Sequence, residues 1–165
     1  TEGIRVNDIA DSLDFYPEVL IENNRFTENR GRGILMGSGK RSVVRSNYFR
    51  LNGTPVLLES DCVYWYESGA VRDLLIEGNV FEDCIYTEKP WGSELIKTAP
   101  RAFVEKDRYY HGRIEIRGND FSGSYARAVD IGNTREVIIE DNRMNRYPET
   151  VVLHHCGGTG TGGKE

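Results

Sequence analysis

Two features of membrane and nucleic-acid proteins are missing from this sequence. No apolar run approaches the roughly 20 residues that a helix needs to cross a bilayer. Acidic residues outnumber basic ones by 26 to 21, which gives the 165-residue chain a net charge of −5. Because a protein that binds a phosphate backbone usually carries a basic surplus, we expect neither a membrane nor a nucleic acid as a partner.

Patterns that bind metals or phosphates are also missing. The three cysteines, Cys62, Cys84 and Cys156, are odd in number and lack a metal-type spacing, so we interpret them as small buried apolar residues. The three histidines are equally scattered. The stretch GSGK (37–40) does not open a helix after a strand, so it is predicted to be a turn and not a phosphate cradle. We therefore expect no metal and no cofactor.

What the sequence does contain is a repeat. Five segments share a short run of mainly branched apolar residues, a polar pair, an asparagine, one variable residue and a large apolar side chain. They are VLIENNRF (19–26), SVVRSNYF (42–49), LLIEGNVF (74–81), IEIRGNDF (114–121) and VIIEDNRM (137–144). The asparagines follow one another at intervals of 23, 32, 40 and 23 residues. A period near 23 is too short for helical hairpin repeats and fits one coil of a parallel β-helix.

The repeat predicts an all-β fold, a right-handed parallel β-helix (solenoid) of about five turns with two inserted loops. Equivalent side chains of successive turns lie about 4.8 Å apart and stack in files. The asparagine amides are expected to hydrogen-bond along the axis at a bend, where Asn also tolerates the left-handed backbone conformation. The large residues two positions after each asparagine are expected to stack inside as the core; they are Phe26, Phe49, Phe81, Phe121 and Met144.

A second strand follows each asparagine by about ten residues, and alternation sorts its side chains into two faces. These strands are predicted at 33–37, 55–60, 93–97, 128–132 and 150–155. The inward positions are Ile34, Met36, Val56, Leu58, Val129, Ile131, Val151 and Leu153. The outward positions, in one external row, are Leu35, Leu57, Glu59, Asp130, Val152 and His154. Glu59 and Asp130 are thus expected on one face, two turns apart, where polar groups can line a groove for an extended ligand.

Two insertions, at 61–73 and 87–112, interrupt the repeat and carry most of the candidate binding residues. Loops inserted on one face of a solenoid usually carry binding. Aromatic rings stack on the apolar patches of sugars, and the aromatic candidates are Tyr64, Trp65, Tyr66, Trp91, Tyr109 and Tyr110. Carboxylates and arginines bind hydroxyl groups, and the polar candidates are Arg30, Arg32, Glu59, Asp61, Glu67 and Asp130. An acidic loop is also typical of an ordinary solvated surface, so that interpretation stays open.

Two stretches resemble the later β-helical turns of glycoside hydrolase family 110. They are VLIENNRFTENRGRGILM (19–36) and PVLLESDCVYWYESGAVRDLLIEGNVFEDCIY (55–86), and the similarity runs from about Val19 to Tyr147. The resemblance implies a bacterial, secreted or periplasmic, exo-acting α-galactosidase. Its typical substrate is the α-1,3-linked galactose of blood group B-type glycans, and its mechanism is inverting, with one carboxylic acid and one carboxylate base.

On this basis Glu59, Asp61 and Glu67 are the candidate catalytic residues. The substrate-binding candidates are Arg30, Arg32, Trp65, Tyr66, Asp130 and Trp91. The family pattern also includes an adjacent Asp pair in an earlier turn, and this sequence has no Asp-Asp dipeptide. We therefore expect a piece of such an enzyme that lacks part of the catalytic set, with a β-helix fragment at 1–156 and a flexible Gly-rich tail at 157–165.

The alternative is a non-catalytic carbohydrate-binding or structural β-helix, which the missing Asp pair favours for the isolated chain. A polysaccharide lyase is expected to show a calcium-binding carboxylate cluster beside a basic residue, and the sequence has no such constellation. For the enzyme the expected partner is a glycan with a terminal α-galactose. For the non-catalytic β-helix it is a glycan or a neighbouring subunit. Because a piece of a solenoid exposes apolar interior and strand edges at its ends, we also expect self-association or marginal stability.

Overall fold

The fold is built from short parallel strands. The computed structural model describes residues 3, 12–60, 65, 69–86, 94–100 and 108–162. In this part of the chain a single 3-10 turn, η1 (Leu13–Phe15), precedes the strands. One sheet contains β1 (Glu18–Glu22), β3 (Arg32–Met36), β4 (Arg41–Arg45), β6 (Thr54–Ser60), β7 (Asp73–Glu77), β9 (Glu94–Pro100), β10 (His111–Arg117), β12 (Arg127–Glu140) and β13 (Val151–Gly162). A smaller sheet contains β2 (Arg25–Thr27), β5 (Tyr48–Arg50), β8 (Val80–Glu82) and β11 (Asp120–Gly123).

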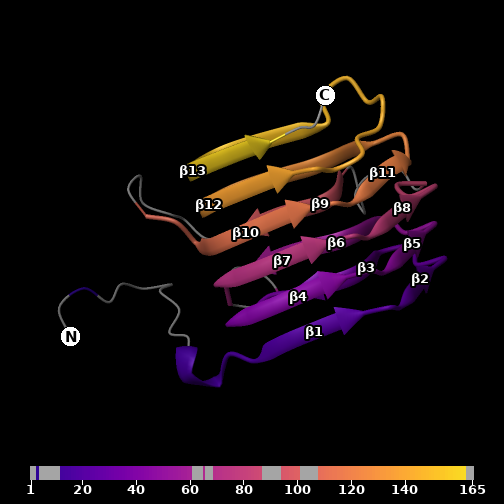
Figure 1. Cartoon of the computed structure of the whole chain (residues 1–165). Coiled ribbons are helices and arrows are strands. Elements are labelled where there is room, and N and C mark those ends of the chain that lie inside the picture. The colour runs from indigo at the N-terminus through magenta and orange to yellow at the C-terminus, as the bar shows by residue number, and fades with distance from the viewer. Residues whose placement is uncertain are drawn as a thin grey trace.

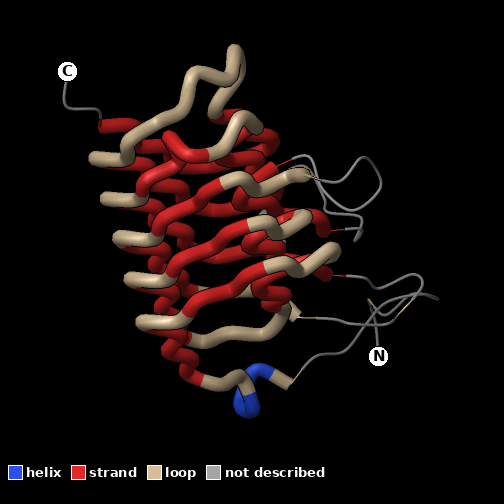
Figure 2. The backbone as a smooth tube through the Cα atoms, turned by 90° about the vertical axis from the view of Figure 1, so that its right-hand side faces the viewer, coloured by secondary structure: helices blue, strands red, loops and turns tan. Residues whose placement is uncertain are grey.

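The larger sheet curls round on itself. Its strand order is β1-β4-β7-β10-β12-β9-β6-β3, with β13 on β12, and its pairings are parallel. The order turns back at β12 because this strand is long enough to span two sides of the coil: 127–130 pairs with β9, and 134–140 pairs with β10. Successive coils therefore stack along one axis (Figures 1 and 2). This all-β, parallel and curled arrangement agrees with the predicted β-helix.

Three faces of the coil can be distinguished by their strands. The first face contains β1, β4, β7, β10 and the second half of β12. The second face is the smaller sheet, in the order β2-β5-β8-β11. The third face contains β3, β6, β9, the first half of β12 and residues 151–154 of β13. The same three faces recur in successive coils because equivalent repeats occupy equivalent positions.

An asparagine ladder marks the bend between the first and second faces, as predicted. The side-chain amide of each asparagine donates to the Oδ1 of the next at 2.9–3.1 Å, in the order Asn24, Asn47, Asn79, Asn119 and Asn142. The amide of Asn79 also donates to the carbonyl oxygen of Val44 at 2.9 Å, and the amides of its buried neighbours make the equivalent bond. The ladder thereby satisfies backbone groups that the bend leaves without a strand partner.

The left-handed conformation at this bend belongs to a different residue from the one predicted. The residue before each ladder asparagine has a φ of 51–61°; these residues are Asn23, Ser46, Gly78, Gly118 and Asp141. The prediction that the ladder asparagines themselves take this conformation was wrong. Their side chains serve hydrogen bonding between coils, and the preceding position supplies the sharp turn.

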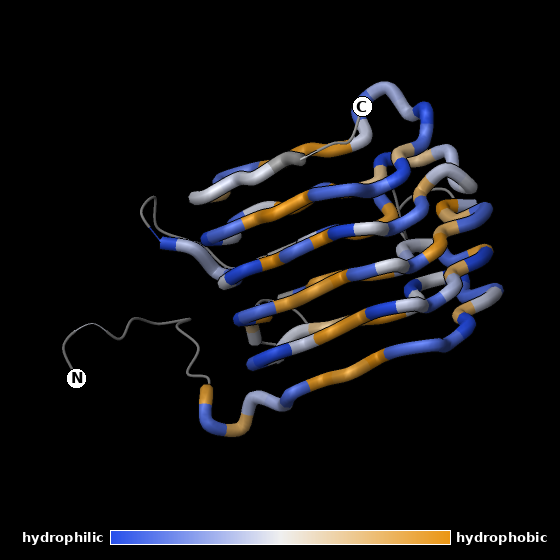
Figure 3. The backbone as a smooth tube through the Cα atoms, viewed as in Figure 1, coloured by the Kyte–Doolittle hydropathy of each residue, from blue (hydrophilic) through white to orange (hydrophobic). Residues whose placement is uncertain are grey.

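Stacked phenylalanines form the centre of the core, as predicted. The rings of Phe26, Phe49, Phe81 and Phe121 follow one another with centroids 4.9, 5.0 and 4.9 Å apart. Met144 packs against this core at one end. Apolar segments of the first face lie above one another in the same way (Figure 3). The coil is therefore held by files of like residues, which is the outcome that the repeat predicts.

The last two strands differ from the predicted segments. Residues 128–132 and 137–144 were expected as separate strands, but β12 runs through both regions and bends at Asn133, whose φ is 50°. The predicted flexible tail at 157–165 also differs, because β13 continues to Gly162 and pairs with β12 from Gly158↔Glu136 to Gly162↔Glu140. Backbone pairing needs only N–H and C=O groups, so a stretch without apolar periodicity can still extend a sheet.

The two predicted insertions lie between strands that the structure describes. The first joins β6 to β7, and of its residues 61–73 only Trp65 and 69–73 belong to the described part. The second, 87–112, contains β9 and ends in β10. Among the described residues, none of the helical structure has the length and apolar character that a membrane span requires.

Candidate functional site

The outer side of the third face brings Glu59 and Asp130 together on one surface. The strand register aligns Leu57 with Lys97 and Lys97 with Asp130. Glu59 stands two residues further along β6, so it is separated from Asp130 by two strand spacings and two residues. With strands about 4.8 Å apart and a rise of about 3.3 Å per residue, their backbone positions lie roughly 12 Å apart. The prediction that the two share a face, two turns apart, is confirmed.

An outward position on β6 is not an exposed one. Leu57 is 5% exposed and Glu59 is 8% exposed, whereas Leu35, in the same file as Leu57 on β3, is 45% exposed. The surface is therefore open over β3 and covered over β6. Glu59 is a carboxylate held within the folded chain and not on a solvated surface.

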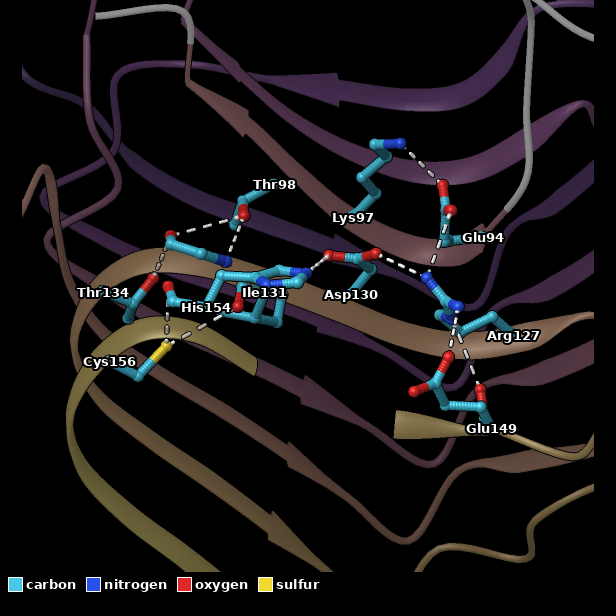
Figure 4. A network of polar contacts seen from close by, with 11 residues as sticks. Glu94, Lys97, Thr98, Arg127, Asp130, Ile131, Thr134, Glu149, His154 and Cys156 are labelled. Carbon is cyan, nitrogen blue, oxygen red and sulfur yellow. Dashed lines mark hydrogen bonds and ion pairs between the residues drawn. The ribbon is translucent and has the colours of Figure 1, made fainter. Parts of the chain in front are cut away.

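Asp130 is the centre of a polar network (Figure 4). The Nη1 of Arg127 donates to Asp130 Oδ2 at 2.9 Å. On the other side, the Nε2 of His154 lies 3.3 Å from Asp130 Oδ1, a contact that is an ion pair only when the imidazole is protonated. The Asp130 side chain is 15% exposed and that of His154 is 62% exposed. Asp130 is thus fixed from both sides, and His154 is the member of the pair that faces solvent.

The network links three strands through opposed charges. Glu94 and Lys97 on β9 have the same spacing as Arg127 and Asp130 on β12, with the signs reversed, and the register sets Glu94 beside Arg127 and Lys97 beside Asp130. Lys97 bonds Glu94 at 2.7 Å, and Arg127 bonds Glu149, just before β13, also at 2.7 Å. Burial acts to lower the pKa of Arg127, but the carboxylates of Asp130, Glu149 and Glu94 outweigh it and raise that pKa. Arg127 therefore stays a fixed cation that orients Asp130.

Arg30 and Arg32 lie at the start of the same face. Arg30 is exposed in the turn before β3, and Arg32 opens β3, where it pairs with Thr54. A side chain at Gly53 would place its Cβ 2.2 Å from the carbonyl oxygen of Arg30, so only glycine fits beneath this turn. The turn that carries Arg30 is consequently packed directly on the next coil.

The remaining candidates belong to the insertions. Trp65 is 68% exposed, which suits a ring that stacks on a ligand. Asp61, Tyr66, Glu67 and Trp91 lie outside the described residues. The structure thus brings Glu59 and Asp130 to the outer side of the third face. Arg32 opens β3 of this face at a position with the parity of the inward Ile34, and Arg30 lies in the turn before it.

Sequence reasoning missed most of the network. His154 was placed in the outward row but treated as incidental, and Glu94, Lys97, Arg127 and Glu149 were not candidates. The signal was present in the spacing, because Glu-x-x-Lys on one strand and Arg-x-x-Asp on another form complementary pairs once the strands are adjacent and in register. That register depends on how the second insertion is accommodated, which the repeat alone does not specify.

No metal-binding arrangement accompanies this site. Within the ranges that the structure describes, no group of three or more His, Cys, Asp or Glu residues is placed to hold a metal ion. Cys84 is buried, and burial raises the pKa of its thiol. Cys156 is half-buried, and burial raises the pKa of its thiol as well. Cys84 therefore behaves as the buried apolar residue that was predicted, while Cys62 lies outside the described residues.

The arrangement as a whole suits recognition of hydroxyl groups. A carboxylate fixed by a guanidinium accepts hydrogen bonds in a defined direction. Beside it, the ammonium group of a lysine can donate hydrogen bonds, and an imidazole can donate or accept them. Glu59 adds a second, more buried carboxylate on the same face. An exposed indole at Trp65 provides the type of apolar surface on which a sugar ring stacks.

Comparison with known proteins gives a consistent set of relatives. No model of a known protein family matches the chain. Alpha-1,3-galactosidase A of Bacteroides fragilis (strain YCH46) is 34% identical over 116 residues, which cover 70% of this chain and 19% of that protein. Alpha-1,3-galactosidase B of the same strain is 34% identical over 144 residues, which cover 80% of this chain and 24% of that protein.

A more distant relative extends over nearly the whole chain. Alpha-1,3-galactosidase B of Bacteroides thetaiotaomicron is 28% identical over 165 residues, covering 93% of this chain and 27% of that protein. The chain therefore spans less than a third of the length of the relatives it matches. With the β-helical fold, the repeat and these relatives in agreement, the chain belongs to glycoside hydrolase family 110, the family of the alpha-1,3-galactosidases A and B.

Proposed function

We propose that this chain forms a wall of the glycan site in an α-1,3-galactosidase, and that the outer side of the third face is the contact surface. The observation that carries the proposal is the fixed group Arg127–Asp130–His154 on the same face as the buried Glu59. The similarity to alpha-1,3-galactosidases supports the choice of sugar. The site is expected to bind a terminal α-linked galactose.

The proposed reaction is an inverting hydrolysis at the end of a glycan chain. One carboxylic acid protonates the glycosidic oxygen, and a carboxylate on the opposite side of the sugar activates the water that attacks the anomeric carbon. Glu59, Asp61 and Glu67 are the proposed carboxylates of this chain. Arg30, Arg32 and Asp130 bind hydroxyl groups, and Trp65, Tyr66 and Trp91 supply stacking surfaces.

The natural setting follows from the same proposal. The substrate is the α-1,3-linked galactose of blood group B-type glycans, and the enzyme is bacterial and secreted or periplasmic. The coil is right-handed, has about five turns and corresponds to later turns of a longer solenoid. Among the described strands β1 pairs only with β4 and β13 only with β12, and these two edges pair with a second copy in this proposal.

Hydrolysis of galactosyl-α-1,3-galactose tests this function. Galactose release is measured for the protein and for the variants Glu59→Gln and Asp130→Asn, and the anomer released first is identified by NMR. We expect β-galactose as the first product, a loss of at least about 100-fold in kcat for Glu59→Gln, and a smaller loss expressed mainly in KM for Asp130→Asn. Asp83→Asn is the matched control, because Asp83 is an exposed carboxylate whose positive φ asparagine also tolerates.

Unchanged turnover in both test variants would remove these carboxylates from the mechanism, and α-galactose as the first product would contradict inversion. A second function is favoured by one observation: the chain spans 19–27% of the length of the relatives described above. In that case it is a carbohydrate-binding β-helix that cleaves nothing. Saturable binding of the disaccharide without released galactose would support this second function, whereas absence of any binding would leave a structural role.

A further inference from the structure

A hollow of about 510 Å³ lies away from the third-face network, where β11 meets the loop that follows β12. One wall is formed by residues 122–125, at the end of β11 and just after it, and the other by residues 143–146 of the loop. None of these residues belongs to the Asp130 network. The volume falls within the range of sites for small molecules, roughly 300–1,000 Å³.

Both walls of the hollow are fixed by hydrogen bonds. The side-chain amide of Asn145 donates to the carbonyl oxygens of Ser124 and Ala126, both at 2.7 Å. Its Oδ1 accepts from the backbone N–H of Tyr147 at 3.0 Å. One asparagine therefore ties the two walls together, and the shape of the hollow does not depend on a ligand.

The rim of the hollow carries an oriented aromatic ring. Tyr125 is 74% exposed, which is unusual for so large a side chain. Tyr147 meets it edge-on, with centroids 5.5 Å apart and an interplanar angle of 71°. The contact fixes the Tyr125 ring against Tyr147 while most of the Tyr125 side chain stays accessible to a ligand.

Two arginines line the same hollow as this ring. Arg143 lies 3.3 Å from Asp120, and its side chain is 74% exposed. Arg146 is also exposed and lines the hollow, and it makes no ion pair with the described residues. The hollow thus combines one guanidinium without an ion pair to the described residues, one that is partly compensated by Asp120, and an aromatic ring, on a chain whose net charge is −5.

We propose that this hollow binds an anionic sugar. The carboxylate or sulfate group is held by Arg146, assisted by Arg143, because guanidinium groups match these anions in geometry. The apolar side of the sugar ring lies on Tyr125. A neutral sugar lacks the charged anchor and binds more weakly at this position. The site is separate from the proposed hydrolysis, so it does not depend on whether the third face is catalytic.

Titration with galacturonate tests this proposal, with galactose 6-sulfate as a second anionic probe and galactose as the neutral one. Amide resonances of residues 122–126 and 143–146 are followed by NMR. We expect saturable chemical-shift changes there with both anionic sugars, and an affinity for galactose that is lower by about tenfold or more. Arg146→Gln and Tyr125→Ala should each weaken galacturonate binding, the first about tenfold or more. Arg135→Gln removes an equally exposed positive charge elsewhere on the coil and should leave binding unchanged.

Three results would overturn the proposal. Equal affinities for galactose and galacturonate would show that the carboxylate does not contribute to binding through Arg146. Equal weakening by Arg135→Gln and Arg146→Gln would show only general attraction to positive charge. Displacement of galacturonate by equimolar inorganic sulfate, together with no effect of Tyr125→Ala, would show an anion site without sugar recognition. Unchanged melting temperatures of the variants establish that they fold, and because no variant touches the third face, failure here leaves the hydrolysis assay as an independent test.

Discussion

Replacing His111 with leucine should make the free energy of unfolding less sensitive to acid. His111 begins β10 and is 1% exposed. Its ring meets Tyr110 edge-on at 5.0 Å, and neither ring nitrogen has a hydrogen-bond partner in the described part of the chain. Burial, and secondarily the positive charge of Arg72, lower its pKa from 6.5 to about 3.

The sign and size of the effect follow from that pKa. Above pH 6.5 the imidazole is neutral in both the folded and the unfolded states, so it adds no pH dependence. As the pH falls below 6.5, the imidazole binds a proton in the unfolded state, whereas in the folded state it stays neutral until the pH approaches about 3. Stability is therefore lost on acidification, by about 2 kcal/mol at pH 5, because 1.5 pH units lie between that pH and the unfolded-state pKa.

Urea unfolding at pH 7.5, 6 and 5 measures this loss. The parent chain should lose about 2 kcal/mol more than His111→Leu between pH 7.5 and pH 5, whatever the other groups contribute to both. His155→Asn is the control for loss of an exposed histidine, since His155 has a φ of 51° that asparagine accepts. Parallel pH dependence of the parent and His111→Leu would refute a buried neutral imidazole.

Three further predictions concern the coil itself. Asn79→Ala should lower the free energy of unfolding by about 3 kcal/mol or more, because it removes buried hydrogen bonds to both neighbouring coils. Asn24→Ala, at an exposed position, should lower it by less than about 1 kcal/mol. Equal losses for the two variants in urea unfolding would contradict a stabilising role of the buried ladder. Gly53→Ala should cost about 2 kcal/mol, because its Cβ meets the Arg30 carbonyl, and a wild-type melting temperature would contradict this packing. Among the described strands β1 pairs only with β4 and β13 only with β12, and pairing of these edges with a second copy should produce concentration-dependent self-association in sedimentation experiments; a monomer at every concentration would contradict this pairing.

The coil could be predicted because its determinants repeat. Asn47, Asn79 and Asn119 recur at one place in each turn, and only stacking of the turns satisfies their amides together. The left-handed position was misplaced by one residue, because the sequence shows that a bend exists but not which of two adjacent polar residues turns it. At Ser46 the left-handed position is occupied by a serine with a φ of 53°, although glycine and asparagine adopt this conformation more readily.

The candidate site was less predictable because it depends on pairing between distant strands. Asp130 and Lys97 are neighbours only after the second insertion has been accommodated and β9 has found β12. Asp130 was proposed from its outward parity alone, and Arg127, which fixes it, lies one residue before the predicted strand at 128–132. Burial of Glu59 also escaped prediction, since parity gives the direction of a side chain but not what covers it.

The central claim is that the outer side of the third face contacts galactose. NMR titration of the chain with galactosyl-α-1,3-galactose tests it most directly. We predict saturable shifts at Glu59, Asp130 and His154 that weaken in Asp130→Asn and persist in Asp83→Asn. Absence of shifts on this face at millimolar sugar, or shifts confined to other faces, would contradict the account.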